Sequence, residues 1–224
     1  MESMKNLWRN NKGFVLFIGL MFVFRSAVAD WNLVPTSSMN PTLISGDRVM
    51  VNKLAYSVRV PFTLQQIASW SSPARGDVIT FDSPKDEVNL IKRVVAVAGD
   101  VVKMRDNTLS INGKAIERKL VDASRIIPTE SGALLAEIWS EQLGSKQVEV
   151  ARIVAMNRNF DFEAVQVPAG HVLVLGDSRD NSNDSRFIGF IDVQRITGQA
   201  VRVAMSHNPD MFYLPRANRW WLPL

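Results

Sequence analysis

The pattern of hydrophobic positions divides the chain into a continuous apolar segment near the N-terminus and a longer part with strand-like alternation. Residues 13–24 read GFVLFIGLMFVF, and Ala27-Val28-Ala29 continues the apolar character after a short polar interruption. A run of 12 residues is short for crossing a bilayer, but residues 13–29 number 17, the lower end of the spanning range. The pattern predicts one N-terminal transmembrane helix, an anchor at residues 13–29.

Basic residues before this segment set its expected orientation. Lys5, Arg9 and Lys12 precede it, so the positive-inside rule places residues 1–12 in the cytoplasm and the rest of the chain outside. A basic start, a short apolar centre and Ala27-Val28-Ala29 before Asp30 also describe a cleavable secretory signal. Both interpretations export the remainder of the chain; they differ in whether it stays tethered.

Short alternating or β-branched runs, separated by turn residues, dominate the chain from residue 47 onward. Such runs are typical of antiparallel strands. Strands are expected at residues 47–54, 77–81, 90–97, 171–175 and 196–205, and residues 101–116 read as a β-meander. We therefore predict a mainly β fold, with an antiparallel β-sheet core built from residues 30–117 and 166–224.

The intervening residues 118–165 lack the dense turn punctuation of their flanks. They are expected to form an inserted subdomain between the two halves of the core. Within it, SGALLAEIWSEQL at residues 131–143 places Leu134, Leu135 and Ile138 near helical spacing, which predicts a helix.

Composition excludes several classes of function. The 224 residues carry a net charge of only +4, with scattered basic residues, so nucleic acid is not an expected partner. The absence of cysteine excludes disulfides, thiol catalysis and cysteine-ligated zinc. Because there are only two histidines and no HExxH motif, no metal site is expected.

A stiff, hydroxyl-rich segment follows the apolar N-terminal region. Residues 34–43 read VPTSSMNPTL, in which two prolines bracket the hydroxyl residues Thr36, Ser37 and Ser38. Proline restricts its own backbone and that of the preceding residue, so the segment can hold one hydroxyl in a fixed direction. A nucleophilic serine needs such positioning, although an ordinary proline-rich turn has the same pattern.

Both histidines and one lysine are candidate proton acceptors for such a serine. His171 and His207 lie in undistinguished contexts and are expected to be structural, although a triad depends on proximity in space rather than in sequence. Strand alternation places Lys92 on the apolar face of residues 90–97. Burial lowers a lysine pKa from its usual value of roughly 10.4, and a neutral lysine can act as a base. The alternatives are an edge-strand lysine that reaches solvent and a lysine paired with an acid.

A third polar segment, GDSRDNSNDSRFIG at residues 176–189, alternates acids, arginines and small hydroxyl residues. Such a loop forms dense hydrogen bonds, and arginines can hold carboxylates in bidentate pairs. A calcium loop starting at Asp180 would fit in its first positions. However, its sixth position is Ser185 rather than glycine and its twelfth is Ile191 rather than glutamate, so calcium is rejected.

These segments, in this order behind an apolar N-terminus, resemble bacterial type I signal peptidases, membrane-bound Ser-Lys serine proteases that remove signal peptides from exported proteins. The matching segments are residues 35–56, 75–84, 91–100, 170–189 and the region around 196–204. Residues 118–165 then correspond to the variable second domain of that family. The resemblance implies cleavage of preproteins after small residues of the Ala-x-Ala type, without a cofactor. It also implies contact with membrane lipid and a catalytic domain on the outer face of the cytoplasmic membrane.

The resemblance also implies a role for individual side chains. Ser38 corresponds to the nucleophile and Lys92 to its general base. Thr36 corresponds to a hydroxyl residue that forms an oxyanion hole with the Ser38 backbone N–H, and Ser182 to a serine that orients the base. The remaining positions are pocket and scaffold residues: Val34 and Ile91 line pockets for small side chains, Asp184 and Arg186 form a supporting ion pair, and Asp177 and Arg179 provide further scaffolding.

Three other functions compete with this one. Self-cleaving repressors share a Ser-Lys dyad, but they would need a DNA-binding or regulatory segment where this chain has an export segment. A maturation peptidase for a dedicated cargo, such as a pilin, is not distinguished by sequence. A catalytically silent peptide-binding homologue is disfavoured by the presence of Ser38, Lys92 and Ser182.

Overall fold

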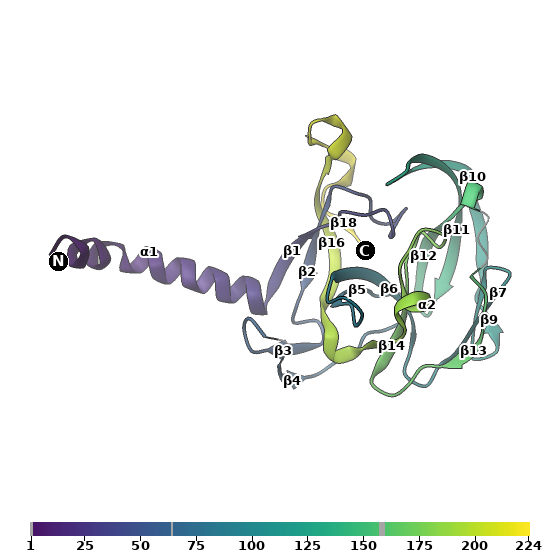
Figure 1. The fold of residues 1–224 in the computed structure, drawn as a ribbon, viewed down its shortest axis with the longest axis horizontal. Helices are drawn as coiled ribbons and strands as arrows, with labels where there is room; N and C mark the ends of the chain where they lie inside the picture. The colour runs from purple at the N-terminus through teal and green to yellow at the C-terminus, as the bar shows by residue number, and fades with distance from the viewer. Residues whose placement is uncertain (1, 64, 157–159) are drawn as a thin grey trace.

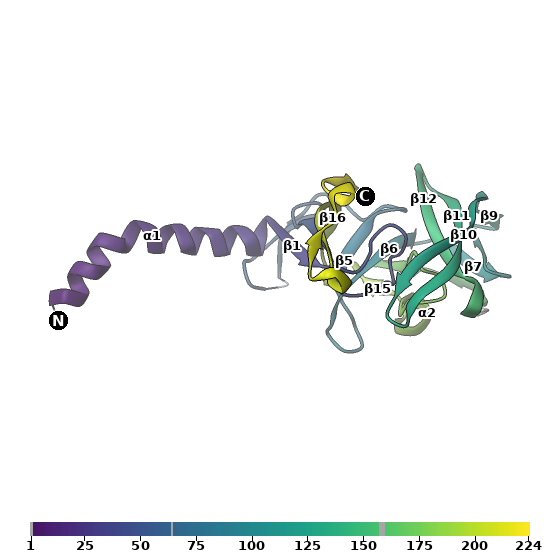
Figure 2. The ribbon, with the colours of Figure 1, turned by 90° about the horizontal axis from the view of Figure 1, so that it is seen from above.

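The long N-terminal helix and a β body make up the protein (Figures 1 and 2). The computed structural model describes residues 2–63, 65–156 and 160–224, with the side chains of 2–10 and 210 outside the description. Helix α1, Glu2–Ala27, extends away from the β body, and the apolar side chains of residues 14–24 are exposed along it, apart from Gly19. Among the described residues, no helix combines the length and apolar character required for a membrane span. The side chains of Lys5 and Arg9, on which the predicted orientation depends, lie outside the described residues.

The principal sheet is antiparallel and forms the centre of the body. In the described part of the chain it contains nine strands. Seven of them lie side by side in one order, and two short strands, β17 (Leu214–Pro215) and β18 (Leu222–Pro223), each pair with β16 (Ile196–Asn208) outside that order. The order of the seven is β1 (Ala29–Leu33), β2 (Asp47–Asn52), β16 (Ile196–Asn208), β5 (Val78–Asp82), β6 (Asn89–Val97), β14 (His171–Leu175) and β15 (Ile191–Asp192). The prediction of a mainly antiparallel β fold is confirmed.

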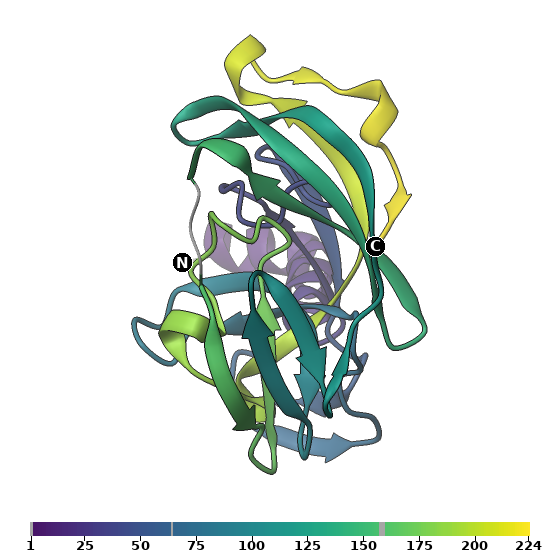
Figure 3. The ribbon, with the colours of Figure 1, turned by 90° about the vertical axis from the view of Figure 1, so that its right-hand side faces the viewer.

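Three smaller sheets complete the body (Figure 3). Their strands are, in spatial order, β10 (Arg118–Thr129), β11 (Gly132–Leu143) and β12 (Lys146–Ile153); β13 (Phe162–Gln166), β7 (Val101–Arg105), β8 (Thr108–Ile111) and β9 (Lys114–Ala115); and β3 (Ser57–Arg59) with β4 (Gln66–Ser69). The remaining short elements are α2 (Ser185–Ile188), β17 (Leu214–Pro215), β18 (Leu222–Pro223) and the 3-10 turns η1 (Val154–Met156), η2 (Val193–Arg195), η3 (Pro209–Met211) and η4 (Ala217–Arg219).

The region predicted as an insertion, residues 118–165, thus contains the β10–β11–β12 sheet and most of β13. Strand β13 pairs with β7, so the end of this region joins the β-meander rather than standing apart from it. Residues 157–159 of the region lie outside the described residues. The predicted division into core and insertion stays a prediction.

The helix predicted at residues 131–143 is wrong. Residues 132–143 form strand β11, which pairs with β10 on one side and β12 on the other. Ala136, Ile138 and Ser140 are buried at every second position, whereas their neighbours Glu137 and Trp139 are only half-buried. A spacing of four residues satisfies the strand period as well as the helix period, so long-range pairing decided the outcome.

The apolar core beneath the predicted nucleophile segment anchors it to the sheet. Met39 and Leu43 from the loop between β1 and β2 are fully buried against Val49, Val78 and Val203. Because buried apolar side chains hold a loop rigidly, the hydroxyl residues beside them occupy a defined place.

Candidate active site

The loop between β1 and β2 places Ser38 at the wall of a cleft. Backbone bonds from Val34 to Asp47 (2.8 Å) and from Gly46 to Val34 (3.0 Å) close the base of this loop. Ser38 is 8% exposed and Thr36 is exposed, so both hydroxyls are accessible from the cleft side. The Thr36 hydroxyl oxygen lies 3.3 Å from that of Ser38.

Lys92 reaches Ser38 from the central strand β6. Its Nζ donates to Ser38 Oγ at 2.9 Å and to the carbonyl of Ile91 at 2.9 Å. Lys92 is 3% exposed, and β6 lies between β5 and β14, so the alternative of an edge lysine reaching solvent is wrong. Burial lowers the pKa of Lys92 to about 8, against the opposing effect of the Asp184 and Asp177 carboxylates. A large fraction of neutral amine is therefore available at mildly alkaline pH.

Gly176 allows the polar loop to approach the nucleophile closely. A Cβ atom at this position would lie 2.2 Å from Ser182 Oγ and 2.5 Å from the Ser38 carbonyl oxygen. The Ser178 backbone N–H donates to that same carbonyl at 3.1 Å. Ser182 Oγ is buried and has no hydrogen-bond partner among the described residues. A hydrogen bond from Ser182 to Lys92, by which this serine would orient the base, is therefore not present in this structure. The backbone can pack this tightly only because glycine has no side chain.

The ion pair between Asp184 and Arg186 organises the loop after Gly176. Arg186 Nε and Nη2 bond the two carboxylate oxygens of Asp184 at 2.8 and 2.7 Å. Asp184 also accepts the Gly176 N–H at 3.0 Å and caps α2, and Arg186 donates to the Arg179 carbonyl at 2.7 Å. The pair thus fixes the turn that carries Ser182.

Asp177 and Arg179 bind partners outside the loop. Arg93, next to Lys92 on β6, donates to both oxygens of Asp177 at 2.8 and 2.7 Å. Arg179 forms a bidentate pair with Glu141 of β11, one bond of which is 2.8 Å. All four side chains are buried, so each charge is neutralised where water does not reach it. Sequence reasoning missed Arg93 and Glu141; the arginine beside the base lysine was a usable signal.

A cleft of about 430 Å³ brings together Thr36, Ser38, Lys92 and Ser182, whereas the scaffold residues Asp177, Arg179, Asp184 and Arg186 are not in its lining. Its lining residues come from five parts of the chain and are Thr36, Ser38, Leu90, Lys92, Glu130, Phe160, Asp180, Asn181, Ser182, Asn183 and Phe187. Val34 and Ile91 are not in this lining; both pack in the apolar cluster beneath Ser38, where Val34 is buried and Ile91 half-buried. Glu130 and Asn181 were not singled out from the sequence, because they belong to no recognisable motif.

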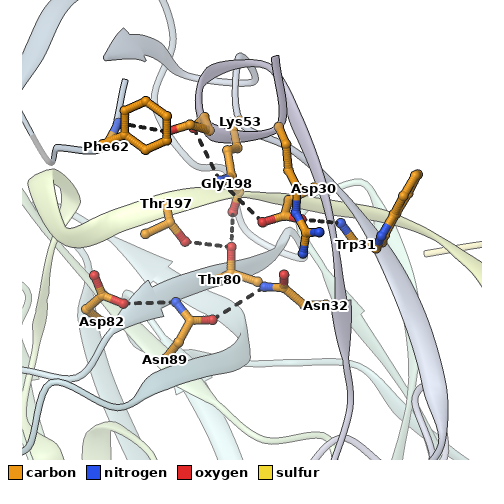
Figure 4. A network of polar contacts seen from close by, with 12 residues as sticks. Asp30, Trp31, Asn32, Lys53, Phe62, Thr80, Asp82, Asn89, Thr197 and Gly198 are labelled. Atoms are coloured by element: carbon orange, nitrogen blue, oxygen red, sulfur yellow. Dashed lines mark hydrogen bonds and ion pairs between the residues drawn. The ribbon is translucent and has the colours of Figure 1, made fainter. Parts of the chain in front are cut away.

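A second polar network joins β1 to β6 and α1 to the sheet (Figure 4). The Asn32 amide donates to the Asn89 side chain at 3.5 Å, linking β1 with the start of β6. Asp30 pairs with Arg25 of α1 at 2.8 Å and with Lys53 at 3.5 Å. The helix end is therefore fixed to strands whose continuations carry Ser38 and Lys92.

No metal centre is evident within the part of the chain that the structure describes, where no three histidine or acidic residues gather in a way that could hold an ion. Neither His171 nor His207 lines the cleft, and His171 Nδ1 instead lies 2.9 Å from the Ala169 carbonyl.

Comparison with known proteins identifies the family. The family model for signal peptidase, peptidase S26, matches residues 7–205. Signal peptidase I of Pseudomonas fluorescens is 37% identical over 221 residues, which cover 93% of this chain and 76% of the relative. The enzyme of Pseudomonas aeruginosa is 34% identical with the same coverage, and that of Aquifex aeolicus is 31% identical over 86% of this chain and 82% of the relative. The chain therefore belongs to the S26 family of serine peptidases and is a signal peptidase I.

Proposed function

We propose that this signal peptidase cleaves preproteins by a Ser-Lys dyad, with Ser38 as the nucleophile and Lys92 as the general base. The observation that carries the proposal is the 2.9 Å hydrogen bond between Lys92 Nζ and Ser38 Oγ in a buried setting. A serine hydroxyl is a weak nucleophile until a neighbouring base removes its proton. Burial supplies that base by favouring the neutral amine of Lys92.

The proposed reaction has two steps. Lys92 takes the hydroxyl proton as Ser38 Oγ bonds to the scissile carbonyl carbon. When the peptide C–N bond breaks, the Lys92 ammonium returns the proton to the leaving nitrogen, and an acyl-serine remains. Neutral Lys92 then takes a proton from a water molecule as its oxygen bonds to the acyl carbon. When the bond from that carbon to Ser38 Oγ breaks, the Lys92 ammonium returns the proton to Oγ, which releases the acid and regenerates the dyad.

Thr36 is proposed to stabilise the oxyanion formed in each step, together with the Ser38 backbone N–H. Its hydroxyl lies 3.3 Å from Ser38 Oγ, on the exposed side of the loop. A donor at this position can follow the charge that develops on the carbonyl oxygen.

Ser182 is proposed to orient the base. Its buried hydroxyl lines the same cleft as Lys92 and has no hydrogen-bond partner among the residues that the structure describes, so it is available to bond the amine. Asp184 with Arg186, and Asp177 and Arg179 with their partners, are proposed to hold this loop and the base strand in place.

Specificity for small residues is proposed to arise from the apolar cluster beside the dyad. Val34, four residues before Ser38, and Ile91, next to Lys92, both pack in this cluster. Little room remains for a bulky substrate side chain there, so alanine-like residues are favoured by exclusion of larger ones.

We further propose that α1 anchors the enzyme in the cytoplasmic membrane, with the β body on the outer face. The support is the exposure of its apolar side chains, such as Phe14 at 65% and Phe22 at 61%, which water solvates poorly. The ion pairs of Asp30 with Arg25 and Lys53 would then hold the site close to the lipid surface.

Membrane fractionation distinguishes the anchor from a cleaved signal. The full-length chain is expected to remain with membranes after an alkaline carbonate wash. Recovery of a shorter chain that begins after Ala29, determined by mass spectrometry, would instead support a cleavable segment.

The catalytic proposal is tested with detergent-solubilised protein and a preprotein whose signal ends in Ala-x-Ala. Wild type is expected to cleave at the correct bond, and Ser38→Ala and Lys92→Ala are each expected to lose essentially all activity. The double variant should be no worse than either single one, because the pair acts as a unit. Substantial cleavage by Lys92→Ala would reject the dyad. A folded wild type that cleaves only one dedicated cargo would favour a specialised maturation peptidase.

A further inference from the structure

The tip of the β10–β11 hairpin contacts the nucleophile loop on both sides of Ser38. The carboxylate of Glu130 accepts hydrogen bonds from the Ser37 backbone N–H at 2.7 Å and from the Ser37 hydroxyl at 2.6 Å. On the other side, the Asn40 amide donates to the carbonyl of Pro128 at 2.6 Å. The hairpin is therefore hydrogen-bonded to the nucleophile loop at the residue before Ser38 and at the second residue after it.

Glu130 also joins the polar loop that carries Ser182. Asn181 Nδ2 donates to Glu130 Oε2 at 3.0 Å and to Ser37 Oγ at 2.8 Å. One carboxylate thus connects the hairpin, the nucleophile loop and the residue before Ser182. Ser37 is only 2% exposed, so its donors have little access to water as an alternative partner.

The charge state of Glu130 suits this role. Burial opposes ionisation, but hydrogen bonds from Ser37 and Asn181 outweigh it and lower the pKa of Glu130 to about 2. The carboxylate is therefore ionised throughout the neutral range and acts purely as an acceptor, as its three donors require.

We infer that Glu130 is a positioning residue for the peptidase, which fixes Ser37 so that the following N–H, that of Ser38, points at the substrate carbonyl. The inference rests on the proposed roles of Ser38 and Lys92. Holding both the backbone nitrogen and the side chain of Ser37 restricts rotation of the peptide that joins Ser37 to Ser38. Because this N–H stabilises charge that develops only in the transition state, loss of Glu130 affects kcat more than KM.

The test compares three variants with wild type in detergent, using the same Ala-x-Ala preprotein. Glu130→Ala is expected to lower kcat roughly tenfold to a hundredfold with KM nearly unchanged. Glu130→Gln retains an amide oxygen for the Ser37 N–H but presents a donor toward Asn181, so an intermediate kcat is expected. Glu163→Ala is the matched control, since Glu163 is an exposed glutamate paired with Lys103 on β7, and it is expected to keep wild-type kinetics.

A double variant tests whether the effect passes through Ser37. Removing the Ser37 hydroxyl in Ser37→Ala leaves its backbone N–H bonded to Glu130. In the Glu130→Ala background the same change is expected to add little further loss, because the partner is already gone. If the losses in kcat caused by Ser37→Ala and Glu130→Ala were fully additive, the effect of Glu130 would not pass through the Ser37 hydroxyl.

Two results would overturn the positioning role of Glu130. One is a wild-type kcat in Glu130→Ala. The other is a fall in kcat that disappears once rates are divided by the folded fraction from circular dichroism. Ser38→Ala distinguishes failure of the proposed dyad from failure of this inference. Cleavage by Ser38→Ala would reject both the dyad and the role of Glu130. A wild-type kcat in Glu130→Ala, with Ser38→Ala inactive, would reject only the role of Glu130.

Discussion

The side-chain amine of Lys92 lies 2.9 Å from the hydroxyl oxygen of Ser38, and 54 residues of sequence separate the two. The pairing of β14 with β6 ends at Leu175 and Arg93, and Lys92 is the residue that immediately precedes Arg93 in the chain. Beyond that point the polar loop turns away from β6 and the cleft begins. Lys92 thus lies where the strand pair ends, so its amine can reach Ser38 and the cleft although residues 92–96 of β6 are buried.

The first prediction concerns the dependence of activity on pH. The pKa of Lys92 is lowered from 10.5 to about 8 by burial, and only the neutral amine can accept the Ser38 proton. We therefore expect kcat/KM to rise as pH increases through about 8 and then to level off. Steady-state cleavage measured between about pH 6 and pH 10 checks this. A rate that falls over the same interval would mean that a protonated Lys92 is the active form.

The second prediction concerns the Thr36 hydroxyl. Thr36→Val keeps the shape of the side chain but removes a donor 3.3 Å from Ser38 Oγ. The expected cost is roughly 3–4 kcal/mol in transition-state stabilisation, expressed as a lower kcat with little change in KM. Thr36→Ser retains a hydroxyl and is expected to stay within roughly tenfold of wild type. Equal kinetics of the valine and serine variants would exclude the hydroxyl from catalysis.

The parts of the site that sequence predicted are those in which residue type and local pattern suffice. Lys92 stood out as a charged residue on an apolar strand face, and the structure buries it there. The antiparallel sheet followed from strand-length runs and turn residues. In these cases the local preference and the final packing agree.

The parts that sequence did not reveal depend on contacts between distant segments. Glu130 bonds Ser37 across 93 residues and Glu141 bonds Arg179 across 38, and nothing near either glutamate in sequence signals its partner. The misassigned helix at residues 131–143 has the same cause. Its apolar spacing fits both periods, and only pairing with β10 and β12 selects the strand.

The third prediction concerns the close approach at Gly176. A methyl group there would meet Ser182 Oγ at 2.2 Å and the Ser38 carbonyl at 2.5 Å. Gly176→Ala is therefore expected to displace the nucleophile loop and to abolish cleavage. Adding Ser182→Gly relieves the first contact but not the second, which is with backbone, so the double variant is also expected to be inactive. Gly19→Ala meets no neighbour within 4 Å and serves as the control for the substitution itself. Full activity in Gly176→Ala would show that the nucleophile loop can move to accommodate the methyl group without loss of catalysis.

The last prediction is that the base lysine lowers the stability of the enzyme. Its pKa is about 8 when folded and near 10.5 when unfolded, so the folded state binds fewer protons between these values. Stability should therefore rise with pH across that interval, and below pH 8 the folded chain carries a buried ammonium at a cost of roughly 3 kcal/mol.

Lys92→Met replaces this group with an apolar side chain of similar length. At pH 7 the variant is expected to be inactive but to melt at a higher temperature than wild type, and the difference in Tm should shrink as pH approaches about 10. Thermal unfolding of both proteins in detergent at the two pH values checks this, with Lys103→Met, a change at a partly exposed lysine, as the control. A methionine variant that melts below wild type at neutral pH would show that Lys92 contributes more through its hydrogen bonds to Ser38 and Ile91 than its burial costs.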